Sequence, residues 1–100
     1  MLNLTAVEIA AITSAFADDE AHFGTPYTEG LSVAVLAGAE LTTFQLDDLD
    51  GVVNRQMERM DEEVVRHEPD AYKALLSMYD KIQAELDRLW TIRDREARNA

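Results

Sequence analysis

Carboxylates are the most numerous side chains in this sequence that could do chemistry, and several stand close together. Residues 47–51 (DDLDG) match part of the EF-hand pattern, which needs calcium ligands at its first and twelfth positions around a glycine at the sixth. With Gly51 as the sixth residue, those two positions fall on Leu46 and Met57, whose side chains cannot bind calcium. We therefore interpret this run as an exposed acidic helix face.

The two histidines each follow a carboxylate by four residues, since Asp18 precedes His22 and Glu63 precedes His67. On a helix this spacing puts an acid beside an imidazole. A helical di-iron site needs a Glu-x-x-His pair on each of two helices, and the sequence has no such pair. We therefore predict no metal site and interpret His67 as a cation at the C-terminal end of a helix, where positive charge is favoured.

Nucleophilic catalysis is not indicated by any pattern in the sequence. There is no cysteine, and the serines Ser14, Ser32 and Ser77 lack the flanking glycines of a nucleophile elbow. The chain also has neither a phosphate-binding Gly-Lys-Ser/Thr element nor a dinucleotide fingerprint. We predict that the protein is not an enzyme, has no catalytic residues and binds no cofactor.

The distribution of charge gives the main functional indication. The net charge is −11, and residues 1–54 contain nine acidic and no basic side chains, whereas residues 55–100 contain eleven acidic and nine basic ones. Such a field repels nucleic acids and anionic lipids and attracts a basic surface. We expect no direct binding to nucleic acid or membrane. The predicted partner-binding acidic face consists of Asp18, Asp19, Glu20, Asp47, Asp48, Asp50, Glu58, Asp61 and Glu62.

Length and composition predict one globular domain over residues 1–100, with 47% apolar residues to form its core. No apolar run approaches the roughly 20 residues that a membrane-spanning helix needs. The N-terminal segment also lacks the basic start of a secretory signal. We expect a cytoplasmic protein.

Residues 69–92 have the clearest helical pattern and predict a helix over about 70–95. Apolar residues follow one another at steps of three and four, as in a heptad seam that faces a partner helix. The seam consists of Tyr72, Leu75, Tyr79, Ile82, Leu86 and Leu89. Four more apolar residues lie off this seam and predict either a central helix or self-association; these are Leu76, Met78, Trp90 and Ile92.

Two further helices are predicted to begin with a capping box, in which Thr and a Glu or Gln three residues later satisfy each other's backbone N–H groups. The two pairs, Thr5 with Glu8 and Thr42 with Gln45, predict helices over about 5–18 and 43–66. We expect the first helix to end between Ala17 and Ala21. Acidic residues are unfavourable at a helix C-terminus, so the helix should stop by Ala17 with Asp18 as the cap of another turn; the alternative is that the acids of residues 18–20 are kept for a partner. The second should continue through Gly51, despite a cost of about 1 kcal/mol, because its apolar periodicity is unbroken there.

Residues 22–30 have the glycines and the proline of a loop, and residues 31–38 (LSVAVLAG) are ambiguous. They predict either a short buried helix ending at Gly38 or a strand that pairs with another copy of the chain. The short connection before Pro69 makes the last two long helices antiparallel neighbours. The predicted fold is therefore all-α, a small helical bundle built on an antiparallel two-helix hairpin with an N-terminal helix packed across it.

Three functional hypotheses follow. The first is a small acidic protein-binding module, such as an inhibitor or nucleic-acid mimic, that docks on a basic surface of a partner protein, for example a nucleic-acid-binding protein. The second is a structural or assembly protein that acts as a helical homo-oligomer, for example a homodimer. The third gives the acidity no specific partner and attributes it to solubility or to adaptation to high salt.

Overall fold

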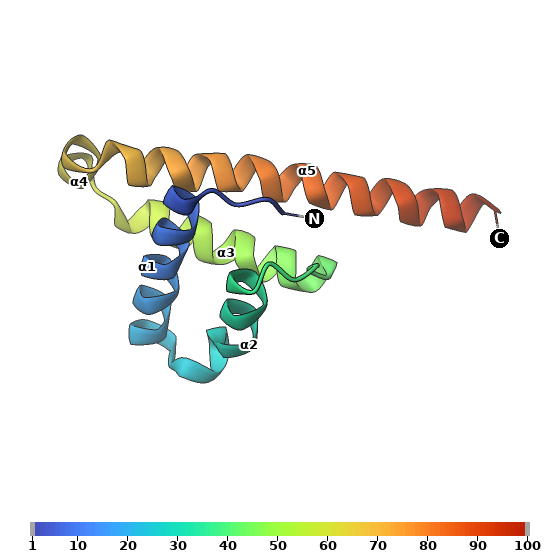
Figure 1. Ribbon diagram of the computed structural model, residues 1–100, viewed down its shortest axis with the longest axis horizontal. Coiled ribbons are helices and arrows are strands. Elements are labelled where there is room, and N and C mark those ends of the chain that lie inside the picture. The colour runs from blue at the N-terminus through green and yellow to red at the C-terminus, as the bar shows by residue number, and fades with distance from the viewer. Residues whose placement is uncertain (1, 100) are drawn as a thin grey trace.

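The computed structural model describes residues 2–99, except for the side chains of residues 25–29 and 99. It contains the helices α1 (Ala6–Phe23), α2 (Thr25–Leu36), α3 (Thr43–Arg59), α4 (Glu62–His67) and α5 (Pro69–Asn99), which are drawn in Figure 1. No strand occurs within the described residues. The all-α prediction is confirmed, and the strand alternative for residues 31–38 is wrong.

Both capping boxes form. Thr5 Oγ1 accepts the backbone N–H of Glu8 at 3.2 Å, and the Glu8 carboxylate accepts the backbone N–H of Thr5 at 2.8 Å. The corresponding distances between Thr42 and Gln45 are 3.1 and 3.0 Å. Each threonine is therefore the N-cap of its helix, and the predicted starts of α1 and α3 are confirmed.

The first helix is longer than the sequence predicts. α1 continues through Asp18, Asp19 and Glu20 to Phe23, so the prediction that it stops by Ala17 is wrong. The physical reason is that the carboxylate of Asp19 binds two arginines, which neutralise an acid near the helix C-terminus.

The expected loop over residues 22–30 is also largely helical, because α2 begins at Thr25 and has a proline in its first turn, where the missing N–H costs little. Of residues 31–38, the first six complete α2. The helix then ends in a Schellman motif: Gly38, at φ 69°, donates its N–H to the Val35 carbonyl at 3.1 Å, and Ala39 donates to Ala34 at 3.0 Å.

The single helix predicted for residues 43–66 is two helices in the structure. α3 runs through Gly51 as expected but ends at Arg59, and Met60 has an extended backbone. Asp61 then caps α4, since its Oδ1 accepts the Val64 N–H at 2.9 Å. An aspartate side chain competes with the helical backbone for such N–H groups, which explains the break within an unbroken apolar pattern.

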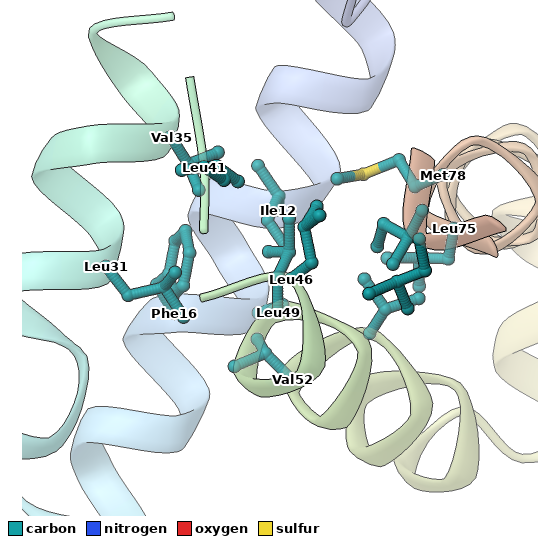
Figure 2. Packing of buried hydrophobic residues seen from close by; sticks show 14 residues of the cluster. Ile12, Phe16, Leu31, Val35, Leu41, Leu46, Leu49, Val52, Leu75 and Met78 are labelled. Carbon is teal, nitrogen blue, oxygen red and sulfur yellow. The ribbon is translucent and has the colours of Figure 1, made fainter. Parts of the chain in front are cut away.

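The hydrophobic core lies where α1, α2, α3 and α5 meet. Figure 2 shows Phe16 of α1 against Leu31 of α2, and Met78 of α5 reaching towards Ile12 of α1. α3 inserts a row of fully buried side chains between these helices, namely Leu46, Leu49, Val52 and Val53. The core thus fixes α3 and α5 against each other and against α1.

α5 is the longest helix and packs against both α3 and α1. In Figure 1, α3 lies under α5, while α1 and α2 form a second pair that runs away from them. The C-terminal part of α5 projects beyond the other helices, and residues 90–98 are all exposed. None of the helices formed by the described residues is long and apolar enough to cross a membrane.

Candidate protein-binding surface

Asp19 was predicted to face a partner, and the structure shows that this is wrong. Its side chain is 0% exposed, and its two oxygens lie 2.7 Å from Arg55 Nη2 and 2.6 Å from Arg59 Nη2. Burial raises the pKa of the Asp19 carboxyl, but hydrogen bonds from the two arginines outweigh it and leave the pKa below its ordinary value. A buried carboxylate persists only when paired in this way, so Asp19 joins α1 to α3 inside the protein.

Gly51 makes room for this network. A Cβ atom at Gly51 would lie 3.1 Å from Arg55 Nη1, so the absence of a side chain lets Arg55 fold back along α3 towards Asp19. The guanidinium of Arg55 also lies 5.4 Å from the centre of the Phe23 ring, a cation–π distance. The free-energy cost of a glycine inside α3 is thus linked to the contact between Arg55 and Asp19.

Two other acids are buried in ion pairs that the sequence analysis missed. Glu8 binds Lys81 Nζ at 2.5 Å, which also donates to the carbonyl of Asn3 at 2.7 Å. Burial raises the pKa of Glu8, while hydrogen bonds from Lys81 and Thr5 lower it below its ordinary value overall. Hydrogen bonding to Arg88 is the largest cause that lowers the pKa of Glu85 to about 2.

The other eight predicted acids lie at least partly at the surface. Asp18, Asp47, Asp48, Glu58, Asp61 and Glu62 are exposed, whereas Glu20 and Asp50 are half-buried. Asp50 Oδ1 accepts a hydrogen bond from Gln83 of α5 at 3.1 Å, so this side of α3 adjoins α5. Burial is the main cause that raises the pKa of Asp50, and the nearby Asp47 adds to it.

Helical spacing separates these acids into groups. Asp47, Asp50 and Glu58 share one side of α3, because they are separated by three and eight residues, and we call them the α3 row. Asp48 follows Asp47 by one residue, which turns its side chain about 100° around the helix axis and off the α3 row. Asp18 lies near the end of α1, where its Oδ2 accepts from Gln56 at 2.9 Å. Asp61 and Glu62 lie at the start of α4.

A second row of carboxylates lies on α5 and was not part of the predicted site. Asp80, Asp87 and Asp94 are all exposed and follow one another at steps of seven residues. This spacing places them on one side of α5, about 10 Å apart along the helix. We call them the α5 row. The heptad spacing is visible in the sequence and could have identified them.

An exposed apolar stripe lies on the same side of α5. One face of α5 is formed by positions 72, 76, 79, 83 and 90. Four of these positions carry the apolar residues that we call the α5 stripe, namely Tyr72, Leu76, Tyr79 and Trp90. The exposed fractions are 42% for Leu76, 37% for Tyr79 and 51% for Trp90, and Tyr72 is half-buried. Gln83 occupies the remaining position and bonds Asp50, so the stripe runs between the α3 row and the α5 row.

The stripe begins at a hollow of about 470 Å³ between the end of α3, α4 and the start of α5. Its lining consists of Met57, Met60, Glu62, Val65, Arg66 and Tyr72. Methionine side chains are flexible and polarizable, so a pair of them can adapt to an apolar group that enters the hollow.

The residues predicted for self-association do not form one patch. Met78 is fully buried in the core, so its assignment to an exposed interface is wrong. Leu76 and Trp90 are exposed and both belong to the α5 stripe, whereas Ile92 lies two residues beyond Trp90 and therefore on the other side of α5. The Arg93 guanidinium lies 5.4 Å from the centre of the Trp90 ring.

Comparison of the chain with family models, with curated proteins and with solved structures finds no match. Its function is therefore inferred from its own surface. Within the described residues, no three His, Asp or Glu side chains converge in a way that could hold a metal ion. The most distinctive surface is the α3/α5 face, which consists of the α5 stripe with the α3 row and the α5 row beside it.

Proposed function

We propose that this protein is a small acidic, non-enzymatic protein-binding module whose α3/α5 face docks on a basic surface of a partner. The observation that carries this proposal is an exposed apolar stripe with carboxylates on both sides. Apolar area at the centre of an interface supplies affinity, while a charged rim selects the partner and speeds the encounter. A nucleic-acid-binding protein is a suitable partner, because its own binding surface is basic.

The scaffold that we propose for this role is a hairpin of α3 and α5 with α1 packed across it. Such a scaffold holds the two acidic rows in fixed positions, so little conformational entropy is lost on binding. We place the module in the cytoplasm, since a chain with no cysteine draws no stability from an oxidising compartment.

Homo-oligomerisation is the second candidate. The exposure of Leu76 and Trp90 on one stripe favours it, because two copies could bury these side chains against each other. It ranks second because a two-fold interface brings each surface against itself, and the acidic rows would then face like charges.

The proposed function is tested by affinity capture from the source cells at low and at high salt, with Asp47→Lys beside the unaltered chain. Asp48→Lys is the matched control, because it makes the same charge change one residue away and off the α3 row. We expect basic proteins to be retained at low salt, released at high salt and lost in Asp47→Lys but not in Asp48→Lys. Equal retention by the two variants would count against the α3/α5 face.

A further inference from the structure

We propose that the occupant of the α3/α5 face is a single cationic amphipathic helix of a partner protein, lying along α5 with its apolar side on the α5 stripe. This inference rests on the proposed function and specifies its partner. Its basis is the shape of the stripe, the charge on either side of it, and the hollow in which it begins.

The stripe has the dimensions of a helix-binding surface. Its outermost members, Tyr72 and Trp90, are 18 residues apart on one straight helix, a length of about 27 Å. A partner helix of about 18 residues spans that distance, and its apolar side chains recur at steps of three and four like those of the stripe. Tyrosine and tryptophan are also the residue types that contribute most to binding energy at interfaces.

The stripe is separate from the part of α5 that holds the fold together. Leu75, Met78 and Ile82 are at most 1% exposed and form the core side of the helix. Leu76 and Tyr79 each follow a core residue by one position, which turns them about 100° away from the core. The stripe can therefore accept a partner without rearrangement of the bundle.

The charges identify the partner as cationic. The α3 row lies on one side of the stripe and the α5 row on the other, and five of these six carboxylates are exposed. The acids of the α5 row are about 10 Å apart, which equals two turns of a partner helix. Lysine or arginine at every seventh position of that helix would meet them in turn.

A second copy of this chain fits the same face less well. In a two-fold antiparallel pairing of two α5 helices centred near Gln83, residues at about equal distances on either side of Gln83 meet. Leu76 would then meet Trp90, but Asp80 of one copy would lie beside Asp87 of the other. Opposed carboxylates disfavour that arrangement.

The hollow at the start of the stripe would bind one end of the partner helix and so fix its position along α5. Met57, Met60 and Tyr72 provide apolar lining, and the volume of about 470 Å³ accommodates one large side chain. An aromatic or leucine side chain at one end of the partner helix is the group that we expect there.

The test uses the whole chain and two synthetic peptides of about 18 residues with the same leucine and lysine content. One peptide is an amphipathic helix, and the other has its residues reordered so that it has no apolar face. Trp90 is the single tryptophan of the chain and lies on the stripe, so its fluorescence reports contact there. We expect a blue shift that saturates at one amphipathic peptide per chain, and affinity at least about tenfold lower for the reordered peptide.

Substitutions locate the binding site. Leu76→Glu and Tyr79→Glu alter exposed side chains of the stripe, so the fold should persist, which circular dichroism checks. Each is expected to weaken binding of the amphipathic peptide at least about tenfold. Val33→Glu is the matched control, because Val33 is 65% exposed on α2 and outside the α3/α5 face; it should leave binding unchanged.

The outcomes separate this inference from the proposed function. Equal affinity for the two peptides, or unchanged binding by both stripe variants, overturns the helix site. The acidic module then still stands if high salt and Asp47→Lys release both peptides, and it fails as well if neither does. A dimer at micromolar concentration that Leu76→Glu dissociates identifies a second copy as the occupant and also overturns the cationic helix.

Discussion

The acidic side chains of this protein lie in two different environments, the interior and the α3/α5 face. In the interior, Asp19 and Glu8 lie between helices, and each is paired with a base. On the α3/α5 face, the α5 row lies at the surface beside an apolar stripe. The same residue types therefore stabilise the fold in one region and, under the proposed function, offer charge to a partner in the other.

The difference between the regions is set by desolvation. Removing a carboxylate from water costs several kcal/mol unless hydrogen bonds and an opposite charge replace the lost hydration, and the interior acids have both. An acid at the surface keeps its water and gains little from ion pairs. Substitution of interior acids should consequently affect stability, and substitution of surface acids should affect binding.

The largest effect is expected for Asp19→Ala, which leaves Arg55 and Arg59 without their shared carboxylate. Removing one partner of a buried pair costs about 3–5 kcal/mol, and the lower end applies because the arginine side chains are 29% and 25% exposed. Asp18→Ala is the matched control and should change the free energy of unfolding by only about 0.5 kcal/mol. Urea denaturation measures both, and similar losses in the two variants would contradict the contrast between interior and surface acids.

Acid should weaken the fold through the interior acids. The pKa values of Asp19, Glu8 and Glu85 are lowered in the folded protein, so the unfolded chain binds protons first as the pH falls. The amount that these carboxylates add to the free energy of unfolding is fully present above about pH 4.5 and is lost progressively as the pH falls further. Urea midpoints between neutral pH and about pH 3 should show this fall, with a shallower slope for Asp19→Asn. An unchanged slope in that variant would show that Asp19 does not contribute.

The sequence predicted the helical class and the starts of α1 and α3, because these depend on local patterns. A capping box needs only a threonine and a Glu or Gln three residues later, and Thr5 and Thr42 both form one. The apolar periodicity of residues 69–92 likewise identified α5, which is longer than expected at its C-terminus.

The errors came from contacts between segments that are far apart in the chain. Asp19 looked like a surface acid because its partners are 36 and 40 residues away, and only the tertiary fold brings them together. The same ion pairs stabilise the part of α1 that extends beyond Ala17. Met78 looked like a surplus apolar residue because the sequence does not show that α1 approaches α5 from that side.

Gly51→Ala tests whether the interior network depends on space along α3. Alanine is favoured over glycine by about 1 kcal/mol inside a helix, but its Cβ would lie 3.1 Å from Arg55 Nη1. We expect no net gain in the unaltered chain, because Arg55 is held by Asp19 and cannot move freely. In an Asp19→Ala background Arg55 can shift, and the gain should approach about 1 kcal/mol. Equal effects in the two backgrounds would show that Gly51 and the network are independent.

Asp50 is intermediate between the two regions and should show the smallest effect, with the opposite sign. It is half-buried, and burial raises the pKa of its carboxyl by more than the hydrogen bond from the neutral Gln83 lowers it. The charged form is therefore disfavoured in the folded protein above the ordinary pKa, and the penalty disappears at pH values below it. Asp50→Asn keeps an acceptor for Gln83 and should stabilise the fold by about 0.5 kcal/mol at neutral pH, with no gain below about pH 3.5. A loss at neutral pH would mean that Asp50 behaves as an interior acid after all.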